Sequence, residues 1–170
     1  RHSCIYVNAD AGIRTPADLV GKRVGNPEYQ MTAPVWIRGI LSDHYGVPVD
    51  SVTYVTGGEE QPGRSEKLKL DLPPAIRVER IGPAQMLRDG EIAALYTART
   101  PSSSHAGDGR VRRRFEDYPD VERAYFRDTG MFPIMHTVVL RRDVYEQHRW
   151  VAQSLYKAFV EAQRRCYADL

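Results

Sequence analysis

The chain has 170 residues, of which 42% are hydrophobic and 27% charged, and its formal net charge is +2. These values are typical of a globular protein of one domain or slightly more. They exclude a strongly basic nucleic-acid-binding protein, and no apolar run approaches the roughly 20 residues that cross a bilayer.

The ends of the chain bear on its location. The opening residues lack a secretory pattern, and Cys4 and Cys166 lack metal-type spacing, so we expect two buried free thiols and a cytoplasmic location. Because Arg1 stands in place of an initiator methionine, we expect the chain to be part of a longer protein.

Strand and helix patterns alternate along residues 1–96. Short strand-like runs predict strands at residues 3–8, 22–25, 52–55, 76–81 and 93–96. Helices are predicted at residues 33–45 and 83–88, and a short one at residues 16–19 that begins after Thr15. Strands that alternate with helices predict an α/β fold with a mostly parallel sheet covered by helices.

The rest of the chain contains fewer strands. Residues 97–110 are rich in Pro, Ser and Gly, which marks a boundary or a mobile loop. Helices are predicted at residues 118–128 and 150–167, the second with its apolar side chains on one face, and a strand is predicted at residues 135–140.

The segment at residues 25–38 is the most informative because it joins a strand, a polar turn and a helix. Thr32 is expected to cap the helix, with Pro34 in its first turn. A helix N-terminus leaves backbone N–H groups unpaired and attracts anions. The alternative is an ordinary strand–helix junction without a ligand.

Polar residues follow several predicted strands, at the positions where an α/β sheet binds ligands. They are Glu28, Tyr29, Gln30 and Thr32 after the second strand, Glu59, Glu60 and Arg64 after the third, and Tyr96, Thr97 and Arg99 after the fifth. Arg38 and Arg64 can bind a carboxylate, or can be a helix-surface ion pair and a loop charge. Glu59 and Glu60 can supply a general acid, or can be solvated.

His136, at the beginning of the strand predicted at residues 135–140, is the most interesting titratable residue. Its imidazole can donate and accept protons near neutral pH, or can be held by a backbone carbonyl in the preceding proline turn. A site that uses both His2 and His136 is left open. The sequence contains no zinc motif, phosphate-binding loop, nucleophile elbow or dinucleotide fingerprint, so no metal ligands are assigned.

Five stretches, in order, resemble the 4,5-dihydroxyphthalate decarboxylase family. They are residues 1–13 (RHSCIYVNADAGI), 25–33 (GNPEYQMTA), 59–64 (EEQPGR), 130–139 (GMFPIMHTVV) and 150–156 (WVAQSLY). That family resembles type II periplasmic binding proteins in fold, so the resemblance implies two α/β lobes that flank a ligand cleft. The family is about twice as long as this chain, so the first lobe is expected to be incomplete and this chain alone to be inactive.

The resemblance also implies how the chain divides. Residues 1–10 are expected to be a crossover strand and residues 11–95 the second α/β lobe. Residues 96–114 are expected to be the return crossover and a loop, and residues 115–170 part of the first lobe.

The activity implied by the resemblance is decarboxylation of an aromatic dicarboxylate, 4,5-dihydroxyphthalate, to protocatechuate and CO2 by protonation of a ring carbon. This chemistry needs an acid, for which His136 and Glu60 are the candidates. It needs a cationic clamp for the retained carboxylate, expected from Arg38, Arg64 and the helix terminus at Thr32. Acceptors for the hydroxyl groups are expected among Glu28, Tyr29 and Glu60, and Tyr96 is a further substrate-binding candidate.

Several questions stay open at this stage. A divalent ion that chelates the catechol is conceivable, as is a reaction without any cofactor. The expected partner is a small aromatic carboxylate, with no nucleic acid and no membrane, and a homo-oligomer is left open. The main alternative function is a solute-binding protein of an ABC-type transporter that captures a small anion without chemistry. A lyase or synthase for another aromatic or thiamine-precursor substrate is a third.

Overall fold

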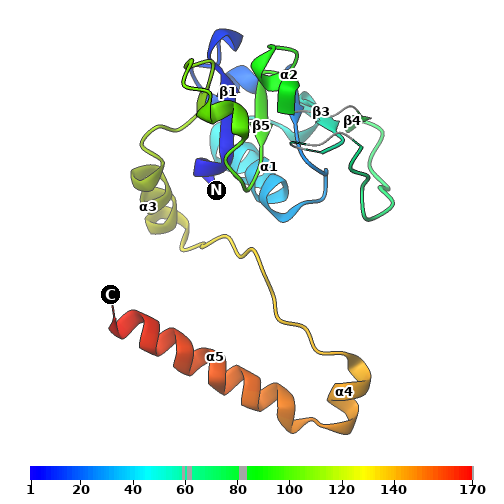
Figure 1. The fold of residues 1–170 in the computed structure, drawn as a ribbon, viewed down its shortest axis with the longest axis vertical. Helices are drawn as coiled ribbons and strands as arrows, with labels where there is room; N and C mark the ends of the chain where they lie inside the picture. Colours follow the sequence, from blue (N-terminus) through cyan, green and yellow to red (C-terminus); the bar gives the residue numbers. More distant parts are fainter. Residues whose placement is uncertain (59, 61–62, 81–83, 170) are drawn as a thin grey trace. The chain divides into compact units, whose positions relative to one another are not determined.

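A mixed sheet organises the first of the two compact units into which the chain divides (Figure 1). The computed structural model describes residues 1–58, 60, 63–80 and 84–169, and the units are Arg1–Met135 and His136–Leu170. Within the described residues the strand order is β4-β3-β2-β5-β1-β6. The strands are β1 (Ile5–Asn8), β2 (Arg23–Gly25), β3 (Thr53–Thr56), β4 (Arg77–Arg80), β5 (Ala94–Tyr96) and β6 (Val111–Arg113).

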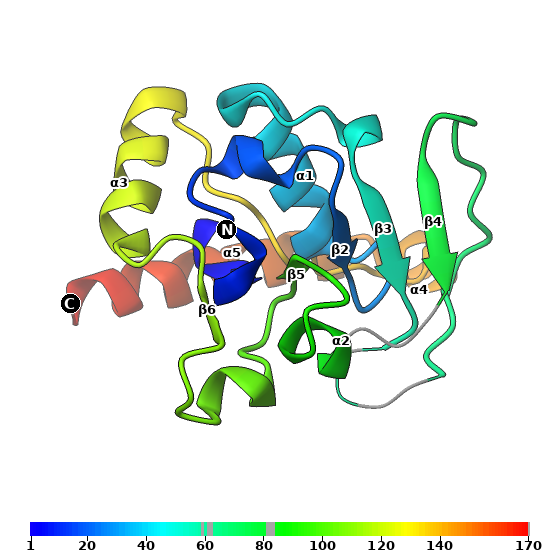
Figure 2. The ribbon, with the colours of Figure 1, turned by 90° about the horizontal axis from the view of Figure 1, so that it is seen from above.

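The four strands β4, β3, β2 and β5 run parallel to one another. Val24 of β2 lies opposite Tyr54 of β3 on one side and Ala94 of β5 on the other. Strand β1 is antiparallel to both of its neighbours, with Tyr6 opposite Leu95. The predicted mostly parallel α/β sheet is therefore confirmed, and β6 is a strand that the sequence patterns did not indicate. Because parallel strands end at the same edge of a sheet, the segments that follow β2, β3 and β5 leave it together (Figure 2).

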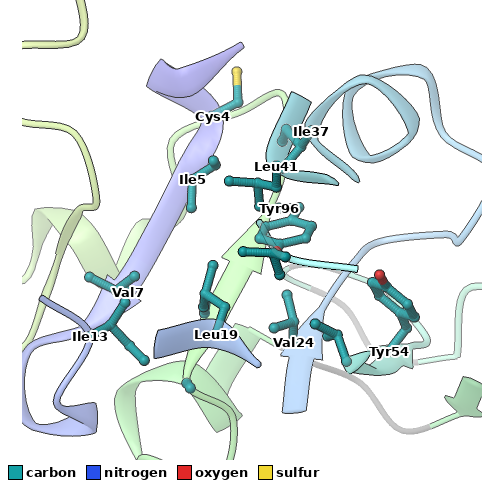
Figure 3. Close-up of a cluster of buried hydrophobic side chains, with 14 of the residues drawn as sticks. Cys4, Ile5, Val7, Ile13, Leu19, Val24, Ile37, Leu41, Tyr54 and Tyr96 are labelled. Carbon is teal, nitrogen blue, oxygen red and sulfur yellow. The ribbon is translucent and has the colours of Figure 1, made fainter. Parts of the chain in front are cut away.

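Helices pack on both faces of the sheet, and alternate strand residues face each of them. The first core cluster includes α1 (Thr32–Tyr45) through Ile37 and Leu41 (Figure 3). The second includes α2 (Ala84–Arg88) through Leu87. The strand residues that Figure 3 labels in the first cluster are Ile5, Val7, Val24, Tyr54 and Tyr96. The second cluster contains the strand residues Tyr6, Val55, Leu95 and Val111. Neighbours along a strand thus point to opposite cores, which is why β5 is buried throughout and β3 is buried in all its residues except the half-buried Thr53.

The remaining helices lie in the C-terminal part of the sequence. Helix α3 (Tyr118–Thr129) belongs to the first unit and packs on the 3-10 helix His2–Cys4. The second unit contains α4 (Arg142–Gln147) and α5 (Trp150–Ala168). The long terminal helix predicted from its apolar periodicity is confirmed. The division of the chain into compact units does not test the lobe boundaries that the family resemblance implies, and these stay predictions.

Three predictions of local structure are wrong. The expected strand at residues 135–140 does not form; a strand needs a hydrogen-bonding neighbour, and the described residues of the second unit contain only helices and irregular segments. Thr32 does not cap α1: it is the first helical residue, and Met31 occupies the cap position without a side-chain bond. Both cysteines are free as expected, but Cys166 is exposed rather than buried. Ile81 and Pro83, at the ends of two predicted elements, lie outside the described residues.

His2 is buried between three aromatic side chains. Its Nε2 lies 3.0 Å from the Tyr45 hydroxyl oxygen, and its ring makes edge contacts with Phe115 and Tyr125, at centroid distances of 5.0 and 5.5 Å. Its Nδ1 has no hydrogen-bond partner among the described residues. Burial is the main reason that the pKa of His2 is lowered to about 4. The folded chain therefore holds this imidazole neutral.

We expect this histidine to make the chain less stable in acid. In the unfolded chain His2 takes up a proton near its ordinary pKa of 6.5, whereas in the folded chain it does so only near pH 4. The free energy of unfolding therefore decreases as the pH falls from about 6.5 to about 4. Between about pH 7.5 and 4.5, urea unfolding should show wild type losing on the order of 1–3 kcal/mol more than His2→Phe. The exposed His148, changed to Phe, is the control that should keep the wild-type slope. Equal slopes for His2→Phe and wild type would contradict the assignment.

Candidate functional site

A hollow of about 650 Å³ lies where the parallel strands end. Its lining comes from the three segments that follow β2, β3 and β5, which are adjacent in the sheet. The lining residues are Pro27, Met31, Gly58, Glu60, Gly63, Arg64, Thr97, Ala98, Arg99 and Thr100. Strand ends at one edge of an α/β sheet are where ligands bind in this fold class, so we treat the hollow as the candidate site.

The Glu28–Arg64 ion pair joins the first two of these segments. Nε of Arg64 lies 2.5 Å from Oε1 of Glu28, and the Lys67 backbone N–H donates to Oε2 at 3.4 Å. Glu28 is only 5% exposed, whereas the Arg64 side chain is 43% exposed. Among the described residues, the guanidinium bonds to Glu28 through Nε alone, which leaves its terminal N–H groups for a ligand. The structure thus brings together two predicted site residues.

Arg38 and Tyr29 form a buried stack instead of lining the hollow. The guanidinium carbon of Arg38 lies 3.8 Å from the centroid of the Tyr29 ring and 5.4 Å from that of Tyr54, and Arg38 is 8% exposed. Burial lowers the pKa of the Arg38 guanidinium, while the electron-rich rings around it favour its charge. The Tyr29 backbone N–H donates to Glu66 Oε1 at 2.6 Å. The expected contact of these side chains with a ligand stays a prediction.

Tyr96 and Thr32 also lie apart from the lining. Tyr96 is 1% exposed within the first core cluster, and burial raises the pKa of its hydroxyl. Thr32 is exposed at the beginning of α1, and the amino end of that helix adjoins the hollow through Met31. These positions do not test a role of Tyr96 or Thr32 in binding. A ligand in the hollow would lie closer to the lining residues than to either of them.

Glu60 connects two walls of the hollow. Its Oε1 accepts a hydrogen bond from the Ser102 backbone N–H at 2.8 Å, and its Oε2 accepts one from the Ser102 hydroxyl at 2.5 Å. The loop that carries Glu60 leaves β3 through Gly57 and Gly58, whose φ angles of 137° and 107° are ones that other residues rarely adopt. Both carboxylate oxygens are therefore engaged in holding the two loops together. Glu59 lies outside the described residues.

The segment Thr97–Thr100 lines the hollow; the sequence patterns placed Thr97 and Arg99 at a ligand-binding edge of the sheet but did not single out Ala98 or Thr100. Oγ1 of Thr100 accepts a hydrogen bond from the Tyr6 hydroxyl at 3.1 Å and one from Arg113 Nη2 at 3.5 Å. Arg99 is exposed, and its backbone N–H donates to Thr97 Oγ1 at 3.2 Å. The signal was present, because these residues directly follow a strand parallel to β2.

The two histidines considered as site residues lie in different units of the chain. His136 is exposed in an irregular segment of the unit His136–Leu170, whereas His2 lies in the core of the first unit. No three His, Cys, Asp or Glu side chains in the described part of the chain are grouped so that they would hold a metal ion. In the same residues, no helix is long and apolar enough to cross a membrane.

The chain is similar to known decarboxylases along most of its length. A 4,5-dihydroxyphthalate decarboxylase of Comamonas testosteroni is 43% identical over 163 residues, which are 94% of this chain and 49% of that protein. One of Pseudomonas putida is 40% identical over 131 residues, 75% of this chain and 51% of that protein. The chain belongs to the 4,5-dihydroxyphthalate decarboxylase family. The family resemblance drawn from the five sequence stretches is thereby confirmed, and the chain spans about half the length of these relatives.

No family model matches the chain. Among solved structures, the periplasmic aliphatic sulphonate-binding protein SsuA of Escherichia coli matches 94% of this chain and 43% of its own chain, with 16% identity and a TM-score of 0.47.

The Glu28–Arg64 pair makes a prediction about stability. Arg64→Gln leaves a buried carboxylate without its cation and should cost about 1–3 kcal/mol in the free energy of unfolding. Adding Glu28→Gln removes the stranded charge, so the double variant should be more stable than the sum of the two single changes predicts, by about 1–2 kcal/mol. Urea unfolding of the four proteins measures this coupling. Single effects that simply add would show that the pair does not act as a unit.

Proposed function

We propose that the protein carrying this chain is a carboxy-lyase that converts 4,5-dihydroxyphthalate to protocatechuate and CO2. The observation that carries the proposal is the 43% identity to a 4,5-dihydroxyphthalate decarboxylase over 94% of this chain. The cationic hollow at the ends of β2, β3 and β5 supports it, because the substrate is a dianion of matching charge.

The reaction follows from the electronic structure of the substrate. Each carboxylate-bearing ring carbon lies para to a hydroxyl group, whose oxygen donates electron density to it. A proton added to one of these carbons gives a cationic ring that the para oxygen stabilises. The bond from this carbon to the carboxylate then breaks, its electron pair returns to the ring, and CO2 leaves. One proton is consumed, and the second carboxylate is retained.

The hollow offers groups for holding such a substrate. Among the described residues the terminal N–H groups of Arg64 have no partner, and Arg99 lines the same hollow from the segment that follows β5. Glu60, whose two oxygens bind Ser102, is better suited to fixing the loops than to delivering the proton. We therefore assign the acid to His136, because histidine is the side chain that most often serves as a general acid in enzymes. The proposal does not specify whether a divalent ion binds the catechol oxygens of the substrate.

The decisive experiment is a CO2-release assay of the intact protein that carries this sequence. With 4,5-dihydroxyphthalate as substrate, we expect one CO2 and one protocatechuate per substrate consumed. Parallel reactions with and without a chelator decide whether a divalent ion is needed. Binding of 4,5-dihydroxyphthalate without any CO2 would overturn the proposal and favour a receptor that captures an anionic solute. Fractionation of cells that express the protein tests the cytoplasmic location, which we include in the proposal.

Replacing the proposed acid separates chemistry from binding. In the intact protein, His136→Ala should lower turnover by about a hundredfold or more, because general acid catalysis contributes roughly 10²–10⁴. The dissociation constant for 4,5-dihydroxyphthalate should change by less than about threefold, since the acid acts in the transition state. His148→Ala, another exposed histidine of the same unit, is the matched control and should retain full turnover. Unchanged turnover in His136→Ala would remove His136 from the mechanism.

A further inference from the structure

The two arginines that line the hollow differ in their partners. Arg64 is bound to the buried Glu28 carboxylate at 2.5 Å. Arg99 is exposed, and within residues 1–58, 60, 63–80 and 84–169 its guanidinium forms no ion pair or hydrogen bond. Its charge and all five of its N–H donors are therefore available to a ligand.

The sheet order places these arginines on opposite walls. Arg64 follows β3 and Arg99 follows β5, and β2 lies between the two strands. Strands pair at about 4.8 Å, so the backbones of β3 and β5 are roughly 10 Å apart where they end. The hydrogen bond from the Arg99 backbone N–H to Thr97 Oγ1 fixes the turn that carries the arginine. A planar ring that bears two carboxylates can contact both walls at once.

We propose that Arg99 binds the carboxylate that the product retains, and so determines the preference of the site for a dicarboxylate. This inference rests on the decarboxylase function proposed above. The guanidinium of Arg99 has no partner among the described residues, and its planar shape suits a carboxylate. It lies on the wall of the hollow opposite Arg64, which is already bound to the buried Glu28.

The chemistry decides which carboxylate Arg99 contacts. The departing carboxylate loses its charge as it becomes CO2, so a strong cation beside it would stabilise the ground state more than the transition state. The retained carboxylate keeps its charge throughout, so a cation can bind it tightly at every stage. Arg64, whose charge Glu28 balances, suits the departing group, and the unbalanced Arg99 suits the retained one.

Steady-state kinetics of the intact protein test this assignment. A contact that is equal in the ground and transition states raises KM when it is lost and leaves kcat unchanged. Arg99→Gln should therefore raise KM for 4,5-dihydroxyphthalate about ten- to hundredfold and change kcat by less than about twofold. Arg77→Gln removes the same charge from an exposed arginine at the opposite end of the parallel strands, and KM should stay within about twofold of wild type. An unchanged KM in Arg99→Gln, or a loss confined to kcat, would overturn the proposal.

Equilibrium dialysis with two unreactive probes separates this proposal from the proposed function. Phthalate carries both carboxylates and benzoate carries one. Wild type should prefer phthalate, and Arg99→Gln should lose most of that preference while its affinity for benzoate falls less. If wild type releases no CO2 but shows this pattern, the decarboxylase function fails and the anion contact stands. If wild type releases CO2 and Arg99→Gln keeps the preference for phthalate, the contact fails and the function stands.

Discussion

The parallel pairing of β2 with β3 on one side and β5 on the other is the constraint on which the candidate site depends. It makes three strands that are neighbours in the sheet end at the same edge, so that three loops from distant parts of the sequence meet there. Backbone hydrogen bonds extend this alignment beyond the strands. The Asn26 N–H donates to the Val55 carbonyl at 2.8 Å, and the Gly58 N–H donates to the Pro27 carbonyl at 3.3 Å. The two walls that follow β2 and β3 are thus joined by main-chain bonds in addition to their side-chain contacts.

The charges around the hollow are arranged in two layers. Below the lining, Glu28 and Arg38 are nearly buried: Glu28 is paired with Arg64, and Arg38 stacks on the faces of Tyr29 and Tyr54 while its Nη1 has no hydrogen-bond partner among the described residues. At the surface, Glu60 is bound by Ser102, and the charge of Arg99 is unpaired within the part of the chain that the structure describes. Buried charges require such partners because desolvation is costly. The pairing of the lower layer therefore holds Arg64 in one place while Arg99 stays available.

The sequence predicts the strands of the sheet other than β6, the helices α1 and α5 and the edge where ligands would bind, because these depend on local periodicity and on the direction of the strands. It misjudges features that depend on partners from elsewhere. The sequence predicts Arg38 of α1 as a clamp for a carboxylate, because its contact with Tyr54 of β3 cannot be read from the local pattern. The partner of Glu60 is Ser102, 42 residues away. Residues 136–140 have the composition of a strand, but the described residues of their unit contain no other strand with which they could pair. Arg99 follows a strand just as Glu28 does, but Glu28 is buried and paired, whereas the Arg99 guanidinium is exposed and has no partner among the described residues.

The hydrogen bond from Tyr6 to Thr100 has a consequence for how this site can change. Thr100 lines the hollow, but the groups that fix its hydroxyl stand on β1 and β6, the antiparallel strands of the sheet. Substitutions in these strands can therefore shift one wall while every residue that touches a ligand stays the same. Relatives that differ only there can diverge in the substrates they accept, and an engineer who wishes to broaden the site has a starting point outside the site itself.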